Sequence, residues 1–351
     1  MNMLISCIFI HNAPARSHRA FTPQEYAMIS TRSDERVSWL KFIFQIKGSV
    51  IPAIFPRVLA CCLFSLVISA LYAQGVPIAL PIESLIPSIV LGLLLVFRTN
   101  TSYERFWEGR KQWGAISNTA RNLARQIWVS IATPSPEEQE KKLITTRLLI
   151  AYAVATKRHL RSESPINPEM ENLMPKAWCE RLQNTSNPPL EIIFWIGNYL
   201  QTQSDNNRLN PYQLSSMFKL LDVMVDALGA CERILRTPIP LAYSIHLKQL
   251  ILLYTLGLPF QMVGKLGWST ALVVGLVAFT VFGIEEIGIE IENPFGYDQN
   301  DLPLDRICQT LEKNIEDMIA LAPEVQKLQG YPSLEKVDHG PALGPLDIDP
   351  V

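Results

Sequence analysis

The amino-acid sequence predicts an all-α membrane protein, in which each subunit has four transmembrane helices and a helical cytoplasmic body. Only 18% of the 351 residues are charged, whereas soluble domains carry about 25%. The shortage is concentrated in four apolar stretches, and a hydrocarbon core of about 30 Å calls for stretches of this length. Outside them, strand patterns are scarce and helix-start signals recur.

The four expected spans differ in how cleanly they are marked. Prolines and Glu83 interrupt the second, so we expect its unbroken helix to begin near Ser88, because a carboxylate at mid-bilayer costs about 3 kcal/mol. Only Gly264 and Lys265 separate the third from the fourth, which predicts a tight helical hairpin. Residues 34–50 mix apolar residues with lysines and predict a helix on the membrane surface. The spans are residues 56–74, 78–97, 239–263 and 266–286.

The cytoplasmic body is expected between the second and third spans, in residues 98–236, and after the fourth span, in residues 303–321. Helix starts are legible where Ser135, Asn167 and Asn210 each precede a proline. Serine and asparagine cap helices, and proline suits the first helical turn. We expect several of these helices to prolong the membrane helices.

A single domain is expected over residues 34–325, with flanking segments outside it. The lead-in, residues 1–33, is expected to be disordered or targeting-like. The tail, residues 326–351, is rich in proline and glycine and is expected to be flexible.

Basic residues close to the expected spans indicate the orientation. The positive-inside rule places loops rich in lysine and arginine in the cytoplasm. Both termini and the central region are therefore expected on the cytoplasmic side of a multi-pass protein. The basic residues that decide this are Arg32, Arg36, Lys41, Lys47, Arg98, Arg105, Arg110 and Lys111.

Several classes of protein are disfavoured by what the sequence lacks. The six cysteines form no CxxC pair and no zinc-ligand spacing, and the five histidines are scattered with no HExxH. No GxSxG nucleophile motif is present. A formal net charge of −2 argues against a nucleic-acid partner. The sequence thus predicts no catalytic residue, no certain metal site and no enzyme.

Two long motifs stand beside the expected spans. Phe97–Arg110 (FRTNTSYERFWEGR) follows the second span, whereas Ile291–Asp298 (IENPFGYD) and Asn300–Pro303 (NDLP) follow the fourth. In this order, the motifs resemble those of the bestrophin-like channel family in bacteria and plastids. The resemblance covers about residues 34–321.

The resemblance implies a homopentamer in a lipid bilayer, with an axial pore for chloride or other small inorganic anions, bicarbonate among them. The membrane would be a bacterial plasma membrane or a thylakoid membrane. Two alternatives stay open. One is a cation (sodium)-selective channel of the same fold, and the other is a non-conducting membrane scaffold.

Three apolar residues are the expected pore neck. Ile89, Leu93 and Phe97 stand at i, i+4 and i+8, on one face of a helix. In family members the matching positions are apolar and line a narrow neck. Five copies would stack three apolar rings, which can gate by dewetting. The alternative is that the three residues pack against another span. Gly92 is expected to let helices approach closely.

Side chains of the first motif are candidates for a vestibule below the neck or for subunit contacts. Its arginines either hold helix ends and neighbouring subunits by pairing with carboxylates, or form a positive vestibule that concentrates anions. Exposed pairs with Glu104 and Glu108 on neighbouring turns are a simpler role. The candidates are Arg98, Asn100, Tyr103, Arg105, Trp107 and Arg110.

The second motif matches the segment that binds calcium in animal relatives. Asn293, Asp298 and Asp301 are retained, whereas Gln299 and Asn300 replace carboxylates. Calcium takes about 6–8 oxygen ligands, so weaker binding is expected. Calcium is therefore a candidate cofactor, and helix capping with subunit contact is the alternative.

Overall fold

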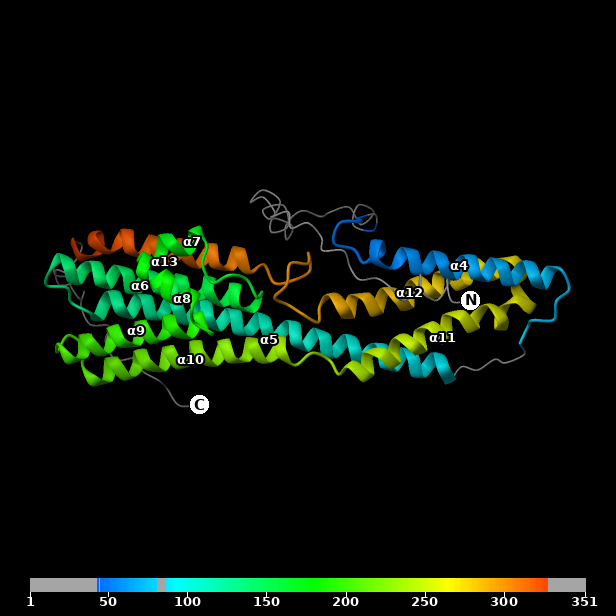
Figure 1. Ribbon diagram of the computed structural model, residues 1–351, viewed down its shortest axis with the longest axis horizontal. Coiled ribbons are helices and arrows are strands. Elements are labelled where there is room, and N and C mark those ends of the chain that lie inside the picture. The colour runs from blue at the N-terminus through cyan, green and yellow to red at the C-terminus, as the bar shows by residue number, and fades with distance from the viewer. Residues whose placement is uncertain (1–42, 44, 81–85, 328–351) are drawn as a thin grey trace, which may run out of the picture. The chain divides into compact units, whose positions relative to one another are not determined.

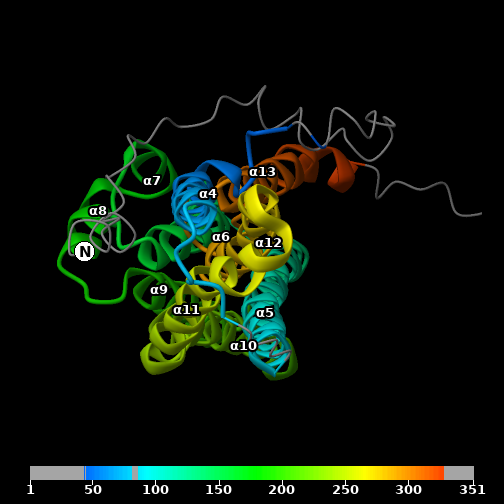
Figure 2. The ribbon, with the colours of Figure 1, turned by 90° about the vertical axis from the view of Figure 1, so that its right-hand side faces the viewer.

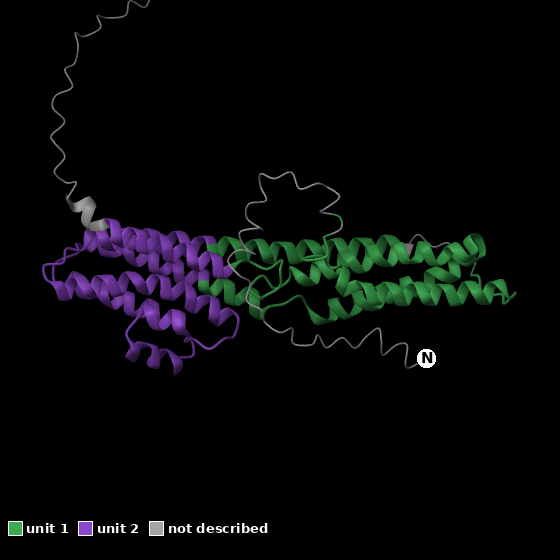
Figure 3. Ribbon diagram, turned by 90° about the horizontal axis from the view of Figure 1, so that it is seen from above, with its two compact units in different colours: residues 1–113, 228–303 green, residues 114–227, 304–351 purple. Residues whose placement is uncertain are grey.

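The computed structural model describes residues 43, 45–80 and 86–327, and these residues form helices and connecting turns without a strand. The chain divides into two compact units, which Figure 3 draws in green and purple. Unit 1 comprises residues 1–113 and 228–303, and unit 2 comprises residues 114–227 and 304–351. The expected lead-in over residues 1–33 and the expected tail after residue 327 lie outside the described residues.

Unit 1 is built around three apolar helices, α4 (Ile51–Ala73), α11 (Leu241–Leu266) and α12 (Thr270–Glu290). They lie side by side in Figures 1 and 2. Their shared core is joined by Leu91 and Leu95 of the first half of α5. The predicted membrane helices are therefore packed as one bundle.

Two described runs are long and apolar enough to cross a membrane. One is Ile51–Ala73, and the other is the 50-residue run Leu241–Glu290, which contains both α11 and α12. The break inside this run lies at the 3₁₀ turn Gly267–Ser269, where Gly267 adopts a positive φ of 53°. The prediction of a turn at Gly264 and Lys265 was wrong by about one helical turn, since α11 continues through both residues.

The segment before α4 also differs from the prediction. Residues 45–50 contain a turn and a bend rather than the end of a surface helix, and Gly48 has a positive φ of 81°. The earlier part of the expected surface helix, residues 34–42, lies outside the described residues. Helix α4 begins at Ile51, with a proline in its first turn. Proline suits this position because it has no N–H, so one fewer N–H group in the first turn lacks an intrahelical partner.

The longest helix is α5 (Ile86–Ser130), which runs for 45 residues without a break. Its start agrees with the expected onset near Ser88. The helix continues well beyond the expected span, as predicted for helices that prolong membrane segments. The boundary between the two units falls within it, after Trp113.

Unit 2 is a helical body whose central helix is α6. The middle of α6, from Leu148 to Ala155, is buried on all sides, as expected for a helix enclosed by others. Tyr152 donates a hydrogen bond to the Met224 carbonyl at 2.6 Å. The helices of unit 2 outside α5 are α6 (Pro136–Leu160), α7 (Pro168–Leu173), α8 (Lys176–Gln183), α9 (Pro188–Asp205), most of α10 (Pro211–Arg236) and α13 (Leu304–Lys327).

Ion pairs fix α13 against α6. Arg147 makes a bidentate pair with Glu316, at 2.7 and 3.0 Å. Lys157 and Arg161 hold the two oxygens of Asp305, at 2.9 and 3.0 Å. Burial alone would raise the pKa of Asp305, but these two cations outweigh it and lower that pKa. Helix α13 begins as predicted, but it continues to residue 327 rather than ending at residue 321.

The three predicted helix starts are confirmed. The side chains of Ser135, Asn167 and Asn210 accept hydrogen bonds from backbone N–H groups three residues later. Asn187 caps α9 in the same way, and its position before two prolines carries the same signal. Local capping chemistry was therefore enough to place these ends.

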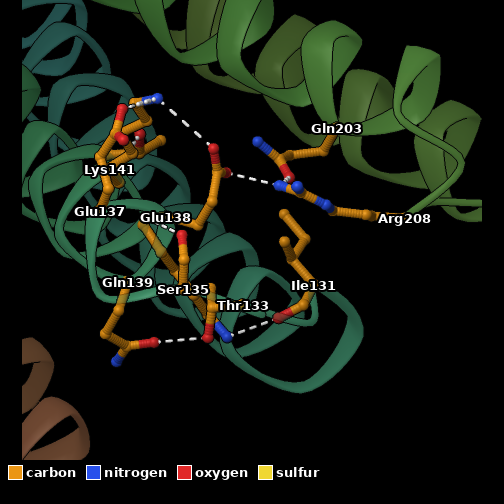
Figure 4. Close-up of polar contacts among 11 residues, drawn as sticks. Ile131, Thr133, Ser135, Glu137, Glu138, Gln139, Lys141, Gln203 and Arg208 are labelled. Atoms are coloured by element: carbon orange, nitrogen blue, oxygen red, sulfur yellow. Dashed lines mark hydrogen bonds and ion pairs between the residues drawn. The ribbon is translucent and has the colours of Figure 1, made fainter.

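Polar contacts also organise the connection from α5 to α6 (Figure 4). Lys142 is buried and donates hydrogen bonds to the carbonyls of Trp128 and Ile131, at 2.9 and 2.7 Å. These carbonyls lie at the end of α5, where helical C=O groups lack intrahelical partners. Beside them, Arg208 pairs with Glu138 at 2.5 Å.

Candidate functional site

The three expected neck residues lie on an uncovered face of α5. The exposed fractions of Ile89, Leu93 and Phe97 are 67%, 53% and 56%. Leu91 and Leu95 are 3% and 4% exposed and face the core of unit 1. The alternative that the three residues pack against another span therefore finds no support within this chain.

Gly92 lies on the same uncovered face. A Cβ atom placed there would meet nothing within 4 Å. Within the described chain, Gly92 therefore makes no close helix approach, and its expected packing role finds no support there.

The uncovered face continues along α5 beyond Phe97. Asn100, Tyr103, Trp107 and Arg110 are exposed. A helix has about 3.6 residues per turn, so Asn100 and Trp107, three and ten residues after Phe97, stay within about 90° of its direction. Tyr103 and Arg110, six and thirteen residues after Phe97, lie more than about 100° away from it. The structure thus exposes four of the six candidate residues of the first motif, and two of them, Asn100 and Trp107, continue the face of Phe97.

Arg98 has a different environment, because its side chain is buried. Its Nη1 donates to Ser244 Oγ of α11 at 3.2 Å, and its Nη2 pairs with Glu292 Oε2 at 3.3 Å. The second oxygen of Glu292 accepts from the Ile239 backbone N–H at 3.0 Å. Arg98 therefore joins helices inside one chain, and this placement does not suit a vestibule surface.

Arg105 binds backbone carbonyls. Its Nε donates to the Glu292 carbonyl at 3.0 Å, and its Nη1 and Nη2 donate to the carbonyls of Thr237 and Ile234 at 2.5 and 2.6 Å. Ile234 lies in the last turn of α10, where a cation is favoured by the helix dipole. Of the two roles considered for the arginines, holding helix ends describes both Arg98 and Arg105.

The two sequence motifs meet in unit 1. Besides the contacts to Glu292, Gly109 faces Pro294 and Phe295 so closely that a Cβ atom would lie 3.0–3.2 Å from their rings. Phe295 is buried. A larger residue at Gly109 would displace this ring, which gives a packing reason for glycine at this point of the first motif.

A second ionic contact links α4 and α12. Arg57 pairs with Glu286 at 2.9 Å and approaches Glu285 at 3.6 Å. Both glutamates lie in the last two turns of α12. Their partner lies more than 200 positions earlier in the chain, so no local pattern connects them.

The acidic segment after α12 borders a pocket of about 270 Å³. Asp298, Gln299 and Asn300 line it, together with Glu290 and residues 46–49, 52 and 53. The Asn300 amide donates to Glu290 Oε2 at 2.6 Å and to the Gly48 carbonyl at 3.5 Å.

The other two calcium candidates serve local turns. Asp301 accepts from the Asp298 backbone N–H at 2.7 Å, and Asn293 accepts from the Phe295 N–H at 3.4 Å. Across the described part of the chain, no group of three or more His, Cys, Asp or Glu side chains could hold a metal ion. The amide and carboxylate oxygens that line the pocket are ligands that a hard cation prefers. Calcium binding at this pocket therefore stays a prediction.

Comparisons with known proteins identify the family. Residues 28–317 match the family model described as bacterial and fungal bestrophin protein, a range that contains both motifs. A Synechocystis protein is 60% identical over 286 residues, 81% of this chain and 93% of its own length. A Nostoc protein is 61% identical over 289 residues, 82% of this chain and 94% of its own. Both are called voltage-dependent anion channel-forming proteins.

The fold has solved counterparts. The crystal structure of a bacterial bestrophin homologue from Klebsiella pneumoniae is 29% identical, with a TM-score of 0.70. The likeness covers 76% of this chain and 98% of that one. The resemblance seen in the two motifs is therefore confirmed, and the chain belongs to the bacterial and fungal bestrophin family of membrane proteins.

Proposed function

We propose that this protein is a homopentameric channel that conducts chloride or other small anions through an axial pore lined by α5. The observation that carries the proposal is the uncovered apolar stripe formed by Ile89, Leu93 and Phe97, opposite a buried face of the same helix. Five copies around an axis would cover this stripe and place its residues in three apolar rings. Such a constriction can gate by dewetting.

The rest of α5 supports a pore rather than a lipid-facing surface. Beyond Phe97, the same face presents Asn100 and other polar or amphipathic side chains. Lipid would not favour these groups at membrane depth. A water-filled path that begins in the neck and widens toward the cytoplasm accounts for both parts of the stripe.

The proposed topology has four spans per subunit. Three are α4, α11 and α12, and the fourth is the first part of α5. The 26 residues of α11 and the 21 residues of α12 correspond to about 39 Å and 32 Å of helix, which is enough for one crossing each. Basic residues before α4 and after the membrane part of α5 would place both termini inside.

Relatives support the choice of anion. Proteins about 60% identical over most of this chain are named voltage-dependent anion channel-forming proteins. The ring edges of Phe97 carry partial positive charge and can favour an anion. Bicarbonate is a candidate for the same pore. An apolar neck does not itself set the sign of the permeant charge, so a cation channel is the competing function.

The test is the reversal potential of the purified protein in a planar bilayer under a potassium chloride gradient. We expect a shift toward the chloride equilibrium potential. A shift toward the potassium equilibrium potential would contradict anion conduction but keep the pore. Absence of current from reconstituted pentamers would contradict the channel itself and favour the scaffold.

A further inference from the structure

We infer that Glu104, held in place by Asn100, lowers the anion selectivity of the pore at the cytoplasmic mouth of the neck. The inference rests on the proposed function, because it needs the α5 stripe to line a pore. Glu104 would act on the permeant ion just beyond the neck. The apolar residues of the neck do not themselves set the sign of the permeant charge.

The position of Glu104 on α5 follows from helix geometry. Glu104 lies seven residues after Phe97, so it stands about 10 Å further along the axis and only about 20° from the direction of Phe97. Asn100 lies between them, three residues after Phe97. Both side chains are exposed. They therefore continue the stripe of Ile89, Leu93 and Phe97 directly.

A hydrogen bond orients the carboxylate. Asn100 Nδ2 donates to Glu104 Oε1 at 3.0 Å. Asn100 is the residue nearer the neck, so this bond holds the carboxylate toward the neck rather than toward the cytoplasm.

No cation compensates Glu104 among the residues that the structure describes. Its sequence neighbour Arg105 is committed to three backbone carbonyls. One turn later, Glu108 differs, because Lys111 lies 3.9 Å from it and Gln112 donates to it at 2.5 Å. Glu104 is therefore the first carboxylate after the neck on this face and lacks the partners that Glu108 has.

Five copies of Glu104 would form a ring of carboxylates around the path. Such a ring raises the local concentration of cations and lowers that of anions. At an ionic strength of about 0.1 M the screening length is about 10 Å, close to the spacing between Glu104 and the neck. The ring would therefore oppose anion entry from the cytoplasm and moderate the anion preference of the pore.

The experiment compares Glu104→Gln with the wild type by reversal potential under a potassium chloride gradient. We expect the chloride-to-potassium permeability ratio to rise by about threefold or more. The difference should shrink when the mean salt concentration is raised to about 1 M, where the screening length is about 3 Å. Glu137→Gln removes an equal charge from an exposed position at the start of α6 and should leave the ratio unchanged.

Two outcomes are separable. An unchanged ratio in conducting Glu104→Gln pentamers would overturn the role of Glu104 and leave the proposed channel intact, since Asn100 and Glu104 would then form only a stabilising pair on a helix surface. Absence of current from the wild type would overturn the channel itself. If Glu104→Gln fails to assemble, Glu104→Lys reads the same position, and a ratio no higher than that of the wild type would overturn the inference.

Discussion

Arg98 and Glu292 form an ionic contact at the end of the unit 1 bundle where α12 ends. Arg98 comes from α5, Glu292 follows α12, and their further partners are Ser244 of α11 and the backbone N–H of Ile239. Four segments are thus joined through two side chains. Removing one partner of such a buried pair leaves the other charge without compensation.

The substitution Arg98→Met tests this contact. It should lower the free energy of unfolding by about 2 to 3 kcal/mol, because Glu292 loses its guanidinium partner inside the protein. Arg110→Met is the matched control, since Arg110 is exposed on the same helix and should change stability by no more than about 0.5 kcal/mol. Chemical unfolding in detergent micelles measures both, and equal effects would contradict the assigned role of Arg98.

The sequence could show the charges of the first motif but not their partners. Arg98 and Arg105 lie within a turn or two of Glu104 and Glu108, so pairing along the helix was a reasonable expectation. Their partners instead lie more than 120 positions away, at Ile234, Thr237 and Glu292. These contacts arise only when helices that are distant in the chain pack together. No local pattern in the sequence indicates that packing.

At the scale of elements, the end of α5 is fixed by a lysine from the next helix. Lys142 of α6 holds the carbonyls of Trp128 and Ile131, and its ammonium lies 4.7 Å from the Trp128 ring centroid. Burial lowers the pKa of Lys142 to about 8. The same side chain thus caps α5 and connects it to α6.

The lowered pKa predicts a pH dependence. A lysine in an unfolded chain has a pKa of about 10.4, so above about pH 8 the unfolded chain binds more protons than the folded one, and stability rises with pH. Relative to Lys142→Met, the wild type should gain about 2 kcal/mol between about pH 7 and about pH 10. Chemical unfolding of both proteins at the two pH values measures the gain. Parallel pH profiles would contradict it.

Lys141→Met is the control for this prediction. Lys141 is exposed and pairs with Glu137 and Glu138, which raise its pKa. Stability from a raised lysine pKa is lost, not gained, as pH rises. Comparison with this variant should therefore not reproduce the gain seen against Lys142→Met.

Most elements were predictable because their signals are local. Hydropathy located the apolar helices, and capping residues located the starts of α6, α7 and α10. The errors fell where competing signals overlap. The pair Gly264 and Lys265 suggested a turn, but Gly267 bends the chain, and residues 45–50 contain a turn although their composition suits a surface helix.

At the scale of the whole molecule, one chain leaves the α5 stripe uncovered. Ile89, Leu93 and Phe97 are large apolar residues on an exposed face, and we propose that four further copies cover that face. The hydropathy pattern of the sequence predicts neither the number of subunits nor the presence of a pore. The family resemblance supplied them as expectations, whereas the fold and the exposed stripe follow from the chain.

The most direct test of the proposed pore is the single-channel conductance of the triple variant Ile89→Ala, Leu93→Ala, Phe97→Ala in a planar bilayer. Widening an apolar constriction lowers its dewetting barrier, so the conductance or open probability should rise by about twofold or more. The control is Leu91→Ala with Leu95→Ala on the buried face, which should cost about 2 kcal/mol of stability at each site without widening the path. An unchanged current in the triple variant would contradict the claim that α5 lines the pore.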